Sequence, residues 1–76
     1  MPRLNCTFAQ VLEILLRNGF VLHRQGSGSH QIYRRAAGSK VWLVTVAYHT
    51  KSDDVPIGTL KSIIRDSGLS QKLFRR

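Results

Sequence analysis

The sequence is short of carboxylates, and they are missing altogether from its middle. It holds four Asp and Glu residues against twelve Lys and Arg, which gives a net charge of +8. None of the four lies between Ile14 and Ser52, a segment that contains six of the cations. So few acids exclude a glycosidase, which needs two carboxylates on opposite sides of a bond. An acid-free basic segment favours a polyanionic partner instead, nucleic acid before an anionic membrane or an acidic protein.

Cysteine, histidine and long apolar runs are scarce as well. Cys6 is the only cysteine, which excludes a disulfide framework and a thiolate metal site. The three histidines, His23, His30 and His49, lack the close spacing of a catalytic zinc site. No nucleotide-binding motif follows the glycines at 26–28, and no apolar run approaches the ~20 residues that span a membrane. We therefore expect a protein of cytoplasmic character with no metal, no small-molecule cofactor and no membrane partner.

The length allows one domain, over residues 1–76. A chain of this size buries only roughly 60 % of its unfolded surface, so it has no room for a deep cleft between thick walls. Any chemistry is therefore expected on a shallow surface.

Local patterns predict a helix, three strands and a second helix. Thr7 and Gln10 form a capping box, and apolar residues at helical spacing follow until Gly19 provides a stop. Strand patterns cover residues 20–25, 29–35 and 40–48. Pro56 suits the first turn of a second helix, and Gly68 ends it. Ser70 could cap a last short turn.

These elements predict an α+β fold, a three-stranded antiparallel sheet with two helices on one face. The other sheet face is then open to water or a ligand. Alternation along the second strand puts His30, Ile32 and Arg34 on one face and Gln31, Tyr33 and Arg35 on the other. Trp42 is expected in the core, or as a stacking platform if it faces the open side, and His23 and His49 are expected at the surface.

His30 is the candidate for catalysis, directly after the small residues 26–29. An imidazole can take and return a proton near neutral pH. RNA carries its own nucleophile, the 2′-hydroxyl, which needs only a base and nearby positive charge. The small residues let a phosphate approach backbone N–H groups, and Arg24, Arg34 and Lys40 could supply the charge. By residue type alone, however, a lone strand histidine is more often an ordinary surface residue.

Three segments stand in a characteristic order, Leu15–Gln25, Gly28–Tyr33 and Gly58–Leu69. Together they resemble the HicA (YcfA-like) toxins of bacterial type II toxin–antitoxin systems, and the resemblance runs from about Leu4 to Phe74. It implies a fold similar to the double-stranded-RNA-binding domain. It also implies an mRNA interferase, an endoribonuclease that is neutralised when a HicB antitoxin covers its site.

The resemblance makes His30 the catalytic residue, Ser29 and Gly28 its supporting loop, and Tyr33 a neighbour on the RNA side. This sequence departs from the family in a longer Gly-Ser loop before His30. It also lacks the proline of a Pro-x-His motif at the end of the third strand, where it reads Ala47-Tyr48-His49.

Several alternatives stay open at this point. His30 could be the general base on the 2′-hydroxyl or the general acid on the leaving 5′-oxygen, and the other proton transfer could fall to water, Tyr33 or a lysine. A non-catalytic module that reads the A-form shape of double-stranded RNA needs the same basic face without a titrating histidine. A DNA-binding protein ranks last, because the chain has no helix-turn-helix pair. The expected partners are mRNA and an acidic surface of a HicB-type antitoxin.

Overall fold

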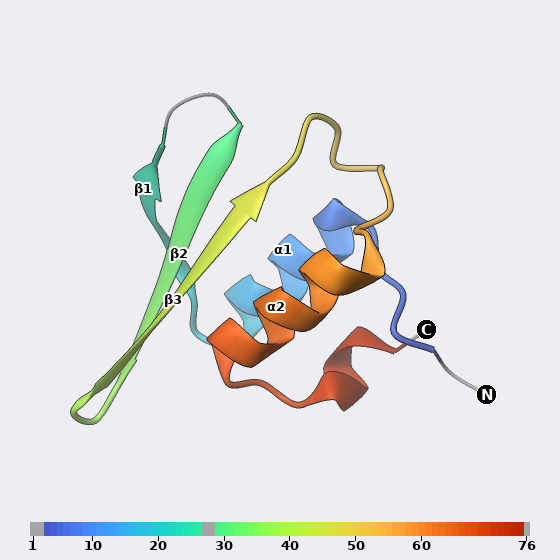
Figure 1. Cartoon of the computed structure of the whole chain (residues 1–76). Helices are drawn as coiled ribbons and strands as arrows, with labels where there is room; N and C mark the ends of the chain where they lie inside the picture. The colour runs from blue at the N-terminus through green and yellow to red at the C-terminus, as the bar shows by residue number, and fades with distance from the viewer. Residues whose placement is uncertain (1–2, 27–28, 76) are drawn as a thin grey trace.

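The computed structural model describes residues 3–26 and 29–75, which form the predicted helix, three strands and helix (Figure 1). The elements are α1 (Phe8–Arg17), β1 (Val21–Gln25), β2 (His30–Ala37), β3 (Lys40–Ala47), α2 (Ile57–Ser67) and a short 3₁₀ helix, η1 (Gln71–Phe74). The α+β prediction is confirmed.

The three strands form one antiparallel sheet in the order β1-β2-β3. Both helices lie on the same side of it, so the sheet has a helix-covered face and an open face (Figure 1). The register puts Tyr33 opposite Leu22 and Val44, and Tyr33 and Val44 are buried beneath the helices. The alternation predicted for β2 is therefore confirmed, with Tyr33 on the helix-covered face and His30 on the open face.

The start of α1 is fixed by the predicted capping box. The Gln10 amide N–H donates to Thr7 Oγ1 at 3.2 Å, and the Thr7 N–H donates to Gln10 Oε1 at 2.9 Å. The loop after β3 adds two more acceptors, because the backbone N–H groups of Phe8 and Ala9 donate to loop carbonyls at 3.0 and 2.9 Å. This loop is thereby tied to the first turn of α1.

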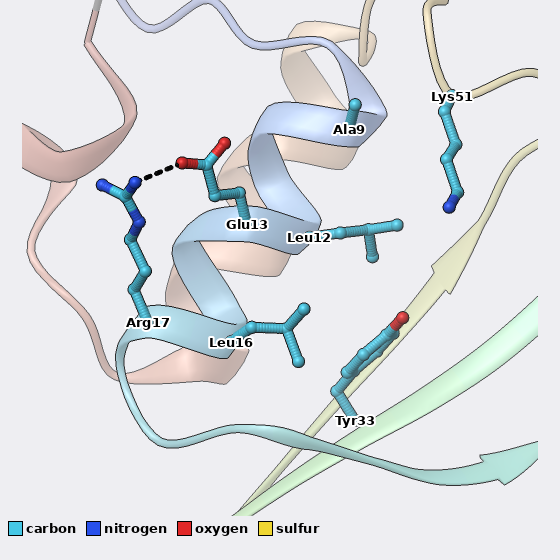
Figure 2. A pocket seen from close by; sticks show the side chains of 7 residues that line it. All are labelled: Ala9, Leu12, Glu13, Leu16, Arg17, Tyr33 and Lys51. Carbon is cyan, nitrogen blue, oxygen red and sulfur yellow. Dashed lines mark ion pairs between the residues drawn. The ribbon is translucent and has the colours of Figure 1, made fainter.

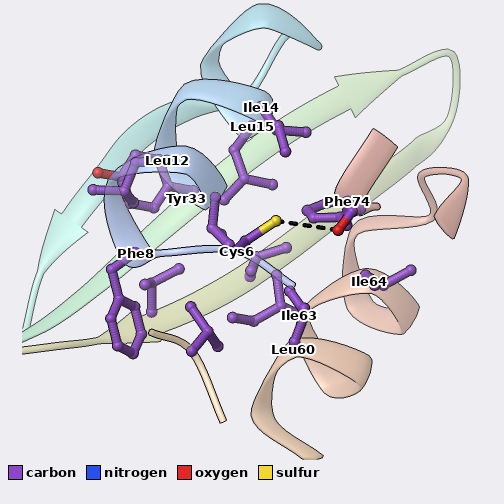
Figure 3. Packing of buried hydrophobic residues seen from close by; sticks show 14 of the residues in the cluster. Cys6, Phe8, Leu12, Ile14, Leu15, Tyr33, Leu60, Ile63, Ile64 and Phe74 are labelled. Carbon is purple, nitrogen blue, oxygen red and sulfur yellow. Dashed lines mark hydrogen bonds between the residues drawn. The ribbon is translucent and has the colours of Figure 1, made fainter. Parts of the chain in front are cut away.

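The core lies between the helices and the covered face of the sheet (Figure 3). The cluster takes Leu15 from α1, Leu60 from α2 and Phe74 from η1, all fully buried. The Cys6 thiol lies inside it and donates to the Phe74 carbonyl at 3.3 Å. Trp42 is partly buried and packs against this cluster, so it lies beside the core and not on the open face.

Four ends of the strands differ from the sequence prediction: β2 begins at His30 and not at residue 29, β3 ends at Ala47 and not at Tyr48, and the start of β1 and the end of β2 differ as well. Phe20 is not part of β1; it is 1 % exposed and belongs to the core. β2 continues to Ala37, so the turn to β3 is shorter than expected. Within the described part of the chain, neither helix is long and apolar enough to cross a membrane.

Candidate functional site

His30 stands at the start of β2, exposed on the open face of the sheet. Its backbone carbonyl accepts the Gly26 N–H at 2.9 Å and the Gln25 side-chain amide at 3.3 Å. Across the sheet it is paired with Ala47, the last residue of β3. The strand end that carries the imidazole is therefore held from both neighbouring strands.

Two arginines share the open face with His30. Arg24 is opposite Ile32, two residues along β2, which makes it a diagonal neighbour of His30 at about 7–8 Å. Arg34 lies four residues along β2, about 13 Å away at ~3.3 Å per residue. None of the three strands contains a carboxylate. A phosphate placed beside His30 thus meets positive charge on one side and no negative charge from the sheet.

Lys40, a predicted phosphate contact, lies at the other end of the sheet. It is paired with Ala37, seven residues from His30 along β2, or roughly 23 Å. Its Nζ lies 4.1 Å from the centre of the Trp42 ring, which also has the Arg35 guanidinium 5.6 Å away. The structure does not bring Lys40 together with His30.

Tyr33 lies on the opposite face from His30. It is 5 % exposed, and its hydroxyl donates to Gln31 Oε1 at 2.9 Å. Burial raises the pKa of Tyr33 above its ordinary value of 10.0, and the neighbouring Tyr48 adds to the increase. The side chains of Tyr33 and His30 therefore do not face a common ligand.

The loop before His30 is described in part. Ser29 lies in the turn directly before β2 and is half-buried. Gly28, the other loop residue predicted to support His30, lies outside the described residues. Gly26, at the start of the loop, lies close to His30, since a Cβ at Gly26 would be 3.3 Å from the His30 Cβ.

A row of hydrogen bonds on the covered face of the sheet, next to His30, was not predicted. It joins the side-chain amides of Gln25 and Gln31 to two tyrosine hydroxyls. Gln31 Oε1 accepts from the Tyr33 and Tyr48 hydroxyls, the latter at 3.4 Å. Gln31 Nε2 donates to Gln25 Oε1 at 3.2 Å, and Gln25 in turn donates to the His30 carbonyl. The alternation along the second strand predicted that Gln31 and Tyr33 share a face. The pairing of Gln25 with Gln31 depends on the β1–β2 register, which the sequence does not show.

The open face also carries exposed aliphatic side chains that the sequence analysis did not single out. Val21 and Leu43 flank Arg34 from the neighbouring strands, with exposed fractions of 60 % and 53 %. Val41, farther along β3, is 48 % exposed. Strand residues of this type are expected to be half-buried, and here no helix covers them.

A hollow of about 460 Å³ lies on the helix side of the sheet (Figure 2). Leu12 and Leu16 of α1 point into it toward Tyr33, and Lys51 reaches in from the loop after β3. At its rim, Glu13 and Arg17 form an ion pair of 2.7 Å. The hollow is mostly apolar and opens on the opposite side of the sheet from His30.

Within residues 3–26 and 29–75, no three His, Cys, Asp or Glu side chains lie together in a group that could hold a metal ion. His23 and His49 are exposed, as predicted.

Comparison with known families gives one match that spans most of the chain. A family model described as "HicA toxin of bacterial toxin-antitoxin" matches residues 8–69. The matched range begins with α1 and ends just after α2, so it includes the whole sheet and His30. No curated protein matches the sequence significantly.

Proposed function

Because this chain belongs to the HicA toxin family of bacterial toxin–antitoxin systems, we propose that it is a metal-independent endoribonuclease in which His30 transfers a proton. Its substrate is mRNA in the cytoplasm, and a HicB-type antitoxin holds it inactive. Family membership supports the toxin role and the antitoxin partner; the cleavage chemistry is inferred from the open face of the sheet.

The observation that carries the proposal is the setting of His30. The imidazole is exposed on a face that holds Arg24 and Arg34 and, along the three strands, no carboxylate. A histidine needs water or substrate within reach in order to exchange a proton. Cations beside it attract a phosphodiester and stabilise the negative charge that grows as the bond is attacked. A shallow face is sufficient, because RNA brings its own nucleophile.

RNA binds across the open face through its phosphates. Arg24 contacts the phosphate under attack, and Arg34 contacts a phosphate farther along the strand direction. Such contacts fix the position of the RNA and give little base readout. His30 either removes the proton of the 2′-hydroxyl or protonates the leaving 5′-oxygen. Tyr33, on the covered face, has no direct contact with RNA in this scheme.

The antitoxin covers the same face. An acidic surface complements Arg24 and Arg34, and apolar side chains complement Val21 and Leu43. A bound antitoxin would therefore exclude RNA from His30.

The test is RNA cleavage in the presence of EDTA. The wild-type protein is compared with His30→Ala and with His23→Ala, a matched change of another exposed histidine. We expect the wild type and His23→Ala to cleave equally, and His30→Ala to bind RNA but cleave at least about 10²-fold more slowly. Equal cleavage by all three proteins rejects the role of His30. RNA binding without any cleavage by the wild type identifies a non-catalytic RNA-binding module instead.

A further inference from the structure

Cleavage of RNA through its 2′-hydroxyl moves two protons, one off the nucleophile and one onto the leaving oxygen. His30 can serve one transfer only. The side chains that the sequence suggested for the other proton transfer, Tyr33 and a lysine, do not lie beside His30. Tyr33 is buried on the covered face, Lys40 is at the far end of the sheet, and Lys51 lines the hollow beside α1 (Figure 2). The second transfer is therefore left to water or to another side chain at the end of the sheet where His30 lies.

His49 follows β3 at that end, where the end of β3 lies beside the start of β2 (Figure 1). His30 is paired with Ala47, so His49 is two residues beyond the partner of His30. Val46 is buried and Tyr48 half-buried, both against the helices. His49 itself lies in a bend two residues past the last residue of β3, beside the end of the sheet that carries His30. It is exposed there.

The backbone around His49 is held on both sides. The Tyr48 ring packs against the Phe8 ring with 5.6 Å between centroids. Two residues beyond His49, the Lys51 carbonyl accepts the Ala9 N–H at 2.9 Å. α1 therefore fixes the chain directly before and after His49. His49 is thereby held near Ala47, the cross-strand partner of His30.

We propose that His49 is the second catalytic histidine and carries out the proton transfer that His30 does not. One imidazole takes the proton of the 2′-hydroxyl, and the 2′-oxygen bonds to phosphorus. The bond from phosphorus to the 5′-oxygen breaks, and the other imidazolium gives its proton to that oxygen. The products are a 2′,3′-cyclic phosphate and a 5′-hydroxyl. This inference rests on the proposed function, because it requires that the protein cleaves RNA.

The experiment uses two substrates with the same sequence, an ordinary RNA and an RNA whose scissile 5′-oxygen is replaced by sulfur. A thiolate leaves without protonation, so the sulfur substrate no longer needs a general acid. Cleavage rates are measured at saturating enzyme for the wild type, His49→Ala, His30→Ala and the control His23→Ala. Thermal unfolding of each variant verifies that it is folded, as expected for changes at exposed positions.

On the ordinary RNA we expect His49→Ala and His30→Ala each to lose at least about 10²-fold in rate, and His23→Ala to lose none. On the sulfur substrate one of the first two recovers to near the wild-type rate, and that variant lacks the acid. Full activity of His49→Ala on ordinary RNA overturns the inference while the proposed function stands. The inference is also overturned if the sulfur substrate restores the cleavage rate of neither His49→Ala nor His30→Ala, or of both. A wild type that cleaves neither substrate refutes the proposed function itself.

Discussion

At the scale of single residues, side chains that are neighbours in sequence lie on opposite faces of the sheet and have different roles. His30 and Gln31 are adjacent, yet one meets solvent beside Arg24 and the other lies in a hydrogen-bonded row with Tyr33 and Gln25. The polar row holds the strand end on one side, while the imidazole is presented on the other. Tyr33, which the sequence placed in the site, lies in this row on the covered face. It can therefore influence His30 only through the backbone of β2.

The buried phenol of Tyr33 makes stability depend on alkaline pH. Burial and then Tyr48 raise the pKa of Tyr33 above 10.0, so the folded state holds this proton more tightly than the unfolded state. The stabilisation is complete below pH 10 and is lost as the pH rises through the folded pKa. We expect the melting temperature of the wild type to fall as the pH rises above 10, and that of Tyr33→Phe to fall less.

Thermal unfolding followed by circular dichroism gives the two curves. At pH 7 Tyr33→Phe is less stable by about 1 kcal/mol, because the hydrogen bond to Gln31 is lost. Curves that run parallel from pH 7 to 11 would show that this phenol has no part in the alkaline loss.

At the scale of elements, the helix ends decide how the helices meet the sheet. Gly68 ends α2 in the left-handed conformation, with φ of +69°, and its Cα faces the Trp42 ring of β3. A Cβ at this position would lie 2.6 Å from two ring carbons. Both the backbone conformation and the ring contact therefore require glycine here.

Gly68→Ala is expected to lower the free energy of unfolding by about 2 kcal/mol or more, from left-handed strain plus displacement of Trp42. Gly58→Ala in the same helix is the matched control, since a Cβ there meets nothing within 4 Å. It is expected to raise the free energy by up to about 1 kcal/mol, through helix propensity. Urea denaturation of both variants measures the difference; equal effects would mean that the Trp42 contact does not matter.

The sequence was sufficient for the elements with local signals and insufficient for long-range placement. The capping box at Thr7, the cap at Ser70 and the alternation around His30 were predicted correctly, because each depends on neighbours within a few residues. Phe20 was assigned to a strand, and only the packing of the whole domain draws it into the core. The distance of Lys40 from His30 follows from the β2–β3 register. This register depends on how the two strands pair, and it cannot be inferred from Lys40 and its neighbours in sequence alone.

At the scale of the whole molecule, size and charge determine how it meets its partners. The radius of gyration is 11.9 Å and the thinnest extent 19 Å, which corresponds to a sheet with one layer of helices. With a net charge of +8 and an acid-free sheet, association with RNA or an acidic antitoxin is expected to be fast and sensitive to salt. In the proposed scheme both partners bind the open face, so only one of them can occupy it at a time.

The salt dependence of the RNA affinity measures how many phosphates the protein contacts. With Arg24 and Arg34 on two phosphates, the logarithm of affinity falls against the logarithm of salt with a slope of about −1.4 for single-stranded RNA. Arg24→Gln should reduce the steepness by about 0.7. Lys61→Gln, an exposed change of equal charge on α2, should leave the slope unchanged. Titrations are made in the His30→Ala background, where cleavage is expected to be at least about 10²-fold slower. Equal slopes for both variants would refute the RNA-binding face.

The most direct measurement of the central claim is the chemistry of the RNA ends that the protein leaves in EDTA. Proton transfer at His30, with the 2′-hydroxyl as nucleophile, predicts a 2′,3′-cyclic phosphate on one fragment and a 5′-hydroxyl on the other. It also predicts no cleavage at a site whose ribose is replaced by 2′-deoxyribose. Fragments that end in a 3′-hydroxyl and begin with a 5′-phosphate, or cleavage of the deoxy site, would contradict the account.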